Sequence, residues 1–177
     1  FYLAYHGRND RDLQRDIAAM YLRIAPALDY RAPQQTESEN TSGKVRIGFI
    51  SMHLHSHTIG RIYLGMIEHL DRSAFDVIVF RTPHSPDEQS LAIDQAADRV
   101  VVVAKDLDQA RQRIADKSLD ILFYPDIGMD PFTYFLAFSR LASVQVVGWG
   151  HPVTTEIPNM DYFLSSVDLE TPDSGDH

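Results

Sequence analysis

Three histidines lie close together in the segment SMHLHSHTIG, which runs from residue 51 to residue 60. Their two-residue spacing would place His53, His55 and His57 on one face of an extended segment, where imidazoles can share a metal ion. No carboxylate lies within this segment to complete such a site, so the sequence predicts no metal. Loop histidines also suit hydrogen bonding to a diphosphate or hydroxyl, or general base catalysis near neutral pH.

A second polar segment, PDIGMDP, covers residues 125–131 and contains Asp126 and Asp130. Either carboxylate can hydrogen-bond a sugar or a peptide, and Asp126 directly follows a predicted strand. Asp130 precedes Pro131 and is predicted to cap the helix that begins there. Asp126 is therefore the candidate ligand-binding residue of this segment.

The third segment, GWGHPVTTEIP, covers residues 148–158 and has two glycines around its tryptophan. Its glycines and prolines indicate a specified backbone path with polar groups at the end of a predicted strand. His151, Pro152, Thr154 and Thr155 are candidate ligand contacts. The alternative is a structural crossover in which the tryptophan packs on the core.

Several nucleotide-binding and thiol-based sites are excluded by what the sequence lacks. The first loop has no GxGxxG, since its nearby glycines are Gly48 within a strand and Gly60 at a helix start, and the chain has no GxxxxGK[ST]. With no cysteine, the chain has no disulfide, thiolate metal site or cysteine nucleophile.

From residue 44 onward, apolar runs alternate with amphipathic segments. The predicted strands are 45–51, 75–80, 99–103, 119–124, 144–149 and 162–165, and the predicted helices are 59–70, 89–97, 106–117 and 131–140. Continuously apolar strands separated by helices indicate a parallel sheet that is covered on both faces. The predicted fold is a doubly wound α/β domain, in which ligands bind beyond the carboxyl ends of the strands.

The N-terminal part is organised differently. Residues 9–28 show apolar positions at three- and four-residue steps, which predict an amphipathic helix. Residues 31–43, RAPQQTESENTSG, contain almost no apolar side chain and predict a flexible linker. The helix is therefore expected either to belong to a region upstream or to pack separately from the sheet.

Length and charge narrow the class of protein. The 177 residues suit one domain, and 44% of them are hydrophobic, which is enough for a sizeable core. No apolar run reaches the roughly 18 residues of a membrane span, and no signal peptide is visible. The net charge is −9, and six acidic residues but no lysine or arginine follow Arg140, so nucleic acid binding is not expected. We expect a cytoplasmic protein.

Together, these segments resemble the bacterial-type protein O-GlcNAc transferase family, in which tetratricopeptide repeats precede a two-lobed GT-B glycosyltransferase. The residues that carry the resemblance are VRIGFIS with His57 six residues on, FDVIVF, LASVQVVGWGHPVTT and IPNMDYFLSS. The N-terminal FYLAYHGRNDRDLQRDIAAMY resembles the join between the last repeat and the catalytic region.

The resemblance implies an inverting enzyme that transfers a GlcNAc-like sugar from a UDP-sugar to Ser or Thr hydroxyls of an acceptor protein, without a metal cofactor. It implies a linking helix over residues 1–30, a linker over 31–43 and a Rossmann-like N-lobe over 44–177, with the C-lobe absent from this chain. This lobe alone is then not expected to transfer sugar. His57 matches a histidine that serves as a base or a positioning group in the cleft. The implied substrate-binding residues are His55, Asp126, His151, Pro152, Thr154 and Thr155.

One position departs from the family pattern. After HPVTT, relatives usually have a small residue, typically glycine, whereas this chain has Glu156. A negative side chain beside a diphosphate would repel the ligand, so either the loop points elsewhere or donor use is altered. Three alternatives stay open: a related UDP-glucose-type protein N-glycosyltransferase, a non-catalytic α/β binding module, and a sugar isomerase or epimerase. The last is disfavoured because no paired acid and base stand out.

Overall fold

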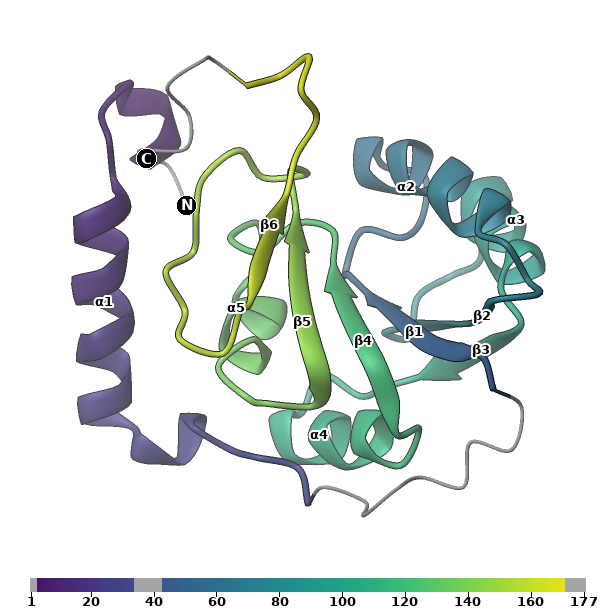
Figure 1. The fold of residues 1–177 in the computed structure, drawn as a ribbon, viewed down its shortest axis with the longest axis horizontal. Coiled ribbons are helices and arrows are strands. Elements are labelled where there is room, and N and C mark those ends of the chain that lie inside the picture. The colour runs from purple at the N-terminus through teal and green to yellow at the C-terminus, as the bar shows by residue number, and fades with distance from the viewer. Residues whose placement is uncertain (1–2, 34–42, 171–177) are drawn as a thin grey trace.

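A computed structural model describes residues 3–33 and 43–170 of the chain. A six-stranded sheet runs through it in the order β3-β2-β1-β4-β5-β6, and every pair of neighbouring strands is parallel (Figure 1). The strands are β1 Val45–Ile50, β2 Phe75–Arg81, β3 Arg99–Val102, β4 Leu119–Tyr124, β5 Ala142–Gly148 and β6 Tyr162–Leu164. The predicted doubly wound parallel fold is confirmed.

The helices are α1 Arg11–Ile24, α2 Thr58–His69, α3 Glu88–Ala96, α4 Leu107–Ala115 and α5 Pro131–Leu136, with short 3₁₀ turns η1 Leu3–His6 and η2 Pro26–Leu28. Four of them lie between the strands where the sequence predicted helices. None of the helices within the described residues is both long and apolar enough to cross a membrane.

Alternating side chains of the central strands build a core on each face of the sheet. In β2, Val77 and Val79 pack with residues of α2 and α3, whereas Ile78 and Phe80 pack with residues of α4 and α5. All four side chains are fully buried. Successive residues of a strand point to opposite faces, so a strand inside a two-sided sheet must be apolar throughout.

Helix α1 shares the core on the α4 and α5 face. Ala18 is buried there, and the ring of Tyr21 lies edge-on to that of Phe135, with 5.1 Å between their centroids. The buried Arg111 of α4 donates through Nη2 to the carbonyl of Ala27, at 3.2 Å. Figure 1 shows α1 alongside α5, at the end of the sheet that β6 forms. The expectation that this helix packs separately is therefore wrong, whereas its link to upstream repeats stays a prediction.

The predicted linker over residues 31–43 lies mostly outside the described residues, but its first residues pair with the lobe. The amide of Arg140 donates to the carbonyl of Tyr30 at 2.8 Å, and the amide of Ala32 donates to the carbonyl of Arg140 at 2.9 Å. This pairing holds residue 140 in extended backbone. The helix that begins at Pro131 was predicted to reach Arg140, and it ends at Leu136 instead.

Candidate functional site

Three loops follow three neighbouring strands at the carboxyl edge of the sheet. Residues 51–57 follow β1, residues 125–130 follow β4 and residues 149–161 follow β5. The strand order continues through β2 and β3 on one side of β1 and through β4, β5 and β6 on the other. The connections after β1 and after β4 therefore lead in opposite directions along the sheet. This change of direction leaves a crevice at the carboxyl edge between β1 and β4, where doubly wound sheets bind ligands. The three segments singled out in the sequence converge there.

Two glycines allow these loops to approach closely. A Cβ atom on Gly60 would lie 2.1 Å from the carbonyl oxygen of His55, and one on Gly150 would lie 2.4 Å from that of Pro125. Real Cβ atoms do not reach such distances, so only glycine fits at either position. The amide of Gly150 also donates to the carbonyl of Pro125 at 3.0 Å, which joins the loop after β5 to the loop after β4.

His57 is the N-cap of α2. Its Nδ1 accepts a hydrogen bond from the amide of Ile59 at 3.2 Å. With Nδ1 occupied as an acceptor, the neutral ring carries its proton on Nε2, which becomes a hydrogen-bond donor. Burial, and secondarily the nearby His55, lower the pKa of His57. The ring is therefore neutral at physiological pH.

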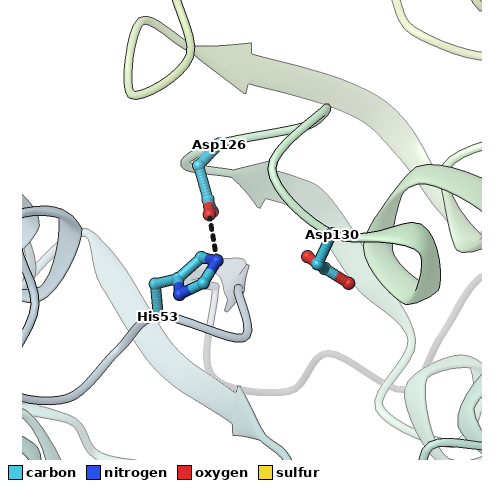
Figure 2. A group of neighbouring side chains, drawn as sticks. All are labelled: His53, Asp126 and Asp130. Atoms are coloured by element: carbon cyan, nitrogen blue, oxygen red, sulfur yellow. Dashed lines mark ion pairs between the residues drawn. The ribbon is translucent and has the colours of Figure 1, made fainter. Parts of the chain in front are cut away.

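His53, in the loop after β1, lies close to the acidic residues of the loop after β4. Its Nε2 lies 3.8 Å from Oδ2 of Asp126, and its ring stacks on that of His57 with 4.4 Å between centroids. Figure 2 shows Asp126 and Asp130 approaching His53 from the loop after β4. One potential ligand atom from each of the three residues lies within 4.8 Å of the others. These residues are the candidate metal ligands of the described part of the chain.

Burial shifts the pKa values of Asp126 and His53. It raises the pKa of Asp126 to about 7, and the charge of Asp130 adds to the effect. The Ser51 hydroxyl opposes part of it, although neither carboxylate oxygen of Asp126 has a hydrogen-bond partner of normal geometry. Burial also lowers the pKa of His53, as does the neighbouring His57, while Asp130 works in the other direction.

A cavity of about 380 Å³ lies where α1, α5 and the loop after β5 meet. Its apolar lining includes Tyr21 and Phe135, and its polar lining includes His151, Thr154 and Thr155. Thr155 is buried, and its hydroxyl accepts a hydrogen bond from the amide of residue 157 at 3.4 Å. The arrangement offers hydroxyl and imidazole groups beside aromatic rings.

Glu156 points to α1. Its two carboxylate oxygens pair with Nε of Arg11 at 3.1 Å and with Nη2 of Arg15 at 3.2 Å. Of the two alternatives raised by the sequence, the structure therefore favours the one in which this side chain points elsewhere. Its φ of +48° lies in the left-handed region that favours glycine, which agrees with the glycine typical of relatives.

The structure gathers the sequence-predicted site residues into two groups. His55, His57 and Asp126 lie with His53 at the ends of β1 and β4, whereas His151, Thr154 and Thr155 line the cavity. Pro152 is exposed and does not line the cavity. Asp130 caps α5 as predicted, accepting a hydrogen bond from the amide of Thr133 at 2.9 Å. None of these placements tests the assigned roles, which stay predictions.

Sequence reasoning missed two kinds of residue. It assigned no role to Arg11 or Arg15, which lie four positions apart on one face of α1, since nothing local points to residue 156. It also favoured the helix cap for Asp130 and did not consider metal binding there, because proximity to His53 arises from the packing of two loops separated by about 70 residues. The two aspartates four residues apart were the available signal.

The fold defines a doubly wound α/β domain, and the three loops lie at the edge of the sheet where such domains bind ligands. No family model matches the chain. A solved structure of a mutant O-GlcNAc transferase from Thermobaculum terrenum has the same fold, with a TM-score of 0.75, 23% sequence identity and 96% of this chain covered. The resemblance indicated by the sequence is therefore supported by a shared fold.

Curated relatives match a shorter part of the chain. Two UDP-glucose:protein N-beta-glucosyltransferases, from Actinobacillus pleuropneumoniae serotypes 5b and 7, are each 33% identical over 84 residues, which is 42% of this chain. The chain covers 14% of each of these relatives and 33% of the solved transferase chain.

Proposed function

We propose that this chain is one lobe of a glycosyltransferase that moves a sugar from a UDP-sugar to a protein side chain, with inversion at the sugar carbon. The single observation that carries the proposal is the convergence of His57, Asp126 and the loop after β5 at the switch point of a sheet that matches an O-GlcNAc transferase over 96% of the chain. A second lobe and upstream repeats, which the resemblance implies, would complete the cleft. No metal is part of this proposed transfer step.

In this proposal His57 is a positioning group. Its Nε2–H would donate to an oxygen of the acceptor or of the diphosphate, because its Nδ1 accepts from Ile59. As the bond from the sugar carbon to the UDP oxygen breaks, the acceptor oxygen forms its bond from the opposite face and releases its proton to the leaving diphosphate or to water. A neutral donor held by a helix N-terminus fixes that geometry and stabilises charge on the leaving oxygen.

The cavity beside α1 is the proposed contact region for substrate. His151 and Thr154 would hydrogen-bond hydroxyl or carbonyl groups there, while Tyr21 and Phe135 supply apolar contact. Arg11 and Arg15 pair with the carboxylate of Glu156 in the same loop. This pairing lowers the electrostatic repulsion between Glu156 and a negatively charged substrate. An anionic donor can then approach without facing an unpaired carboxylate.

A second candidate is transfer of glucose to an asparagine amide. The observation that favours it is the 33% identity with protein N-glucosyltransferases, over a segment that spans 42% of this chain. A non-catalytic binding module would keep the same fold without turnover.

The test uses the parent polypeptide in which this lobe is joined to a second lobe. UDP-GlcNAc and UDP-glucose are each incubated with peptides whose acceptor is Ser, Thr or Asn, and the mass of the product is measured. We expect one hexose or one N-acetylhexosamine to be added, and the lobe alone to add none. A two-lobed protein that transfers neither sugar would contradict the proposed function and favour a binding module.

Two substitutions test the role of His57. His57→Ala removes both the cap and the donor, whereas His57→Asn keeps a capping oxygen and an amide N–H. We expect kcat/KM to fall about 100-fold in the alanine variant and clearly less in the asparagine variant. His69→Ala, at the exposed end of the same helix, is the matched control. Equal loss in both His57 variants would indicate a base instead, since asparagine cannot accept the proton.

A further inference from the structure

Three buried polar atoms face one another at the junction of the loops after β1 and β4 without normal hydrogen-bond partners. They are Nε2 of His53 and both carboxylate oxygens of Asp126. The Asp126 side chain has no exposed surface. A buried polar atom that lacks a partner is costly, so such a group points to a ligand that is held there.

We propose that His53, Asp126 and Asp130 bind one divalent transition-metal ion, with water completing its coordination. One imidazole nitrogen and two carboxylate oxygens form a donor set that suits Zn²⁺ or Mn²⁺ better than Mg²⁺ or Ca²⁺, which prefer oxygen alone. The sequence excluded a metal because the histidine loop contains no carboxylate. The fold supplies two carboxylates from another loop (Figure 2).

The geometry requires only a small contraction. Nε2 of His53 and Oδ2 of Asp126 are 3.8 Å apart, and all three donor atoms lie within 4.8 Å of one another. Ligands of a tetrahedral zinc site are separated by roughly 3.4 Å, given zinc–ligand distances of about 2.1 Å. His53 is only partly buried, so its side chain can rotate toward an ion that the two aspartates hold.

Hydrogen bonds to the backbone hold two of the three residues in place. The Ser51 hydroxyl accepts a hydrogen bond from the amide of His53 at 2.9 Å. Asp130 is held as the N-cap of α5, which leaves lone pairs on its oxygens for an ion. A Cβ atom on Gly150 would lie 3.2 Å from the Cβ of Asp126, so the loop after β5 passes close to the base of this side chain.

Charge balance also favours a cation. Within residues 3–33 and 43–170, neither Asp126 nor Asp130 forms an ion pair with lysine or arginine, and Asp126 pairs only with His53. Once Asp126 is ionised, two carboxylates beside a single imidazole carry excess negative charge, which a divalent ion would compensate in this low-dielectric setting.

The other two histidines of the loop are turned away from this cluster. Nδ1 of His55 lies 3.9 Å from Oδ2 of Asp87, and Nδ1 of His57 accepts from the backbone of α2. A site made of the three histidines alone would require the His57 contact to break, because a ring whose Nδ1 accepts a hydrogen bond carries its proton on Nε2 and has no free nitrogen for a metal. Substitution of His55 therefore distinguishes a site made of His53, Asp126 and Asp130 from a site made of the three histidines.

The experiment measures metal binding by the untagged chain after treatment with a chelator. Calorimetric titration with Zn²⁺, Mn²⁺ and Mg²⁺ is expected to show one site per chain, with Zn²⁺ bound most tightly and Mg²⁺ most weakly. His53→Ala, Asp126→Asn and Asp130→Asn should each weaken Zn²⁺ binding by about tenfold or more. Asparagine at position 130 retains the helix cap, and at position 126 it retains the side-chain volume.

His55→Ala is the matched control, and its affinity for Zn²⁺ should equal that of the unchanged chain. Saturating Zn²⁺ should raise Tm of the unchanged chain and of His55→Ala but not of Asp126→Asn, whose circular dichroism spectrum reports whether it folds. The proposal is overturned by no stoichiometric binding at millimolar Zn²⁺, by affinity that survives in Asp126→Asn and His53→Ala, or by affinity lost in His55→Ala. None of these outcomes depends on sugar transfer.

Discussion

Glu156 shows how a single residue can offset an unfavourable backbone with favourable contacts. Its φ of +48° is strained for any residue with a Cβ, and its carboxylate pairs with Arg11 and Arg15 of α1. Its side chain is 19% exposed, so water screens these pairs only in part. Glycine would relieve the strain and lose the pairs, so the two effects oppose each other.

Two substitutions separate these effects. Glu156→Gln keeps the strained backbone and removes the charge, so we expect the free energy of unfolding to fall by about 1 kcal/mol. Glu156→Gly also relieves about 1 kcal/mol of strain, so its stability should lie close to that of the unchanged chain. Urea denaturation at low salt and at 1 M NaCl measures both. A Glu156→Gln effect that is the same at both salt concentrations would contradict an ion-pair contribution.

Asp126 makes stability depend on pH in the metal-free protein. Because its pKa rises from 3.8 to about 7 on folding, the native state holds this proton between those pH values while the unfolded state releases it. Raising the pH through this window should therefore lower the free energy of unfolding, by roughly 4 kcal/mol once the group is fully ionised.

Denaturation in the presence of a chelator, from pH 4 to pH 8, measures this effect. Asp126→Asn serves as the reference, since it has no proton to lose and should lack this component of the decline. Parallel profiles for the two proteins would show that the carboxyl group ionises normally in the folded chain.

At the scale of single elements, Gln145 links β5 to the crossover loop that leads to β6. Its side chain is fully buried, donates to the carbonyls of Ser139 at 3.0 Å and Asn159 at 2.8 Å, and accepts from the amide of Leu141 at 2.8 Å. A glutamine in this buried strand is thus explained by the three backbone groups with which it forms hydrogen bonds. This side chain therefore helps to fix the path of the loop, together with the contacts of Asn159 and Asp161.

Replacing Gln145 by leucine keeps the volume but leaves those three backbone groups unsatisfied. We expect the free energy of unfolding to fall by about 3 kcal/mol, because each buried unpaired group costs about 1 kcal/mol or more. Thermal and urea denaturation measure the loss. Ser143→Ala, at an exposed position of the same strand, should change stability by less than about 0.5 kcal/mol. A leucine variant as stable as this control would show that the network contributes nothing.

At the scale of the whole molecule, α1 belongs to the same folded unit as the sheet. Tyr21 packs edge-on against the rings of Tyr134, Phe135 and Phe138, and Arg111 joins α4 to the chain beyond α1. The cavity that carries His151 has α1 as one wall. The helix therefore contributes both to stability and to the candidate substrate region.

Deleting residues 1–33 tests this role. The deletion exposes the aromatic side chains of α5, so we expect a loss of several kcal/mol and a fall in Tm of about 10 °C, together with self-association. Differential scanning calorimetry and size-exclusion chromatography report the two effects. Tyr21→Ala is the milder companion variant and should lose about 3 kcal/mol. A truncated chain with unchanged Tm would mean that the lobe folds without its helix.

The sequence by itself determined the order and type of the elements, because fully apolar strands and amphipathic helices follow from residue patterns that extend over only a few positions. It also located the three ligand-edge loops, since each directly follows a strand. Only the tertiary structure decided what those loops hold. Contacts between residues distant in the chain decided the pairing of His53 with Asp126 and the turn of Glu156 toward α1. Local backbone geometry and packing decided the N-cap at His57 and the end of α5 at Leu136. Such contacts arise from packing, which leaves no periodic signal in the sequence.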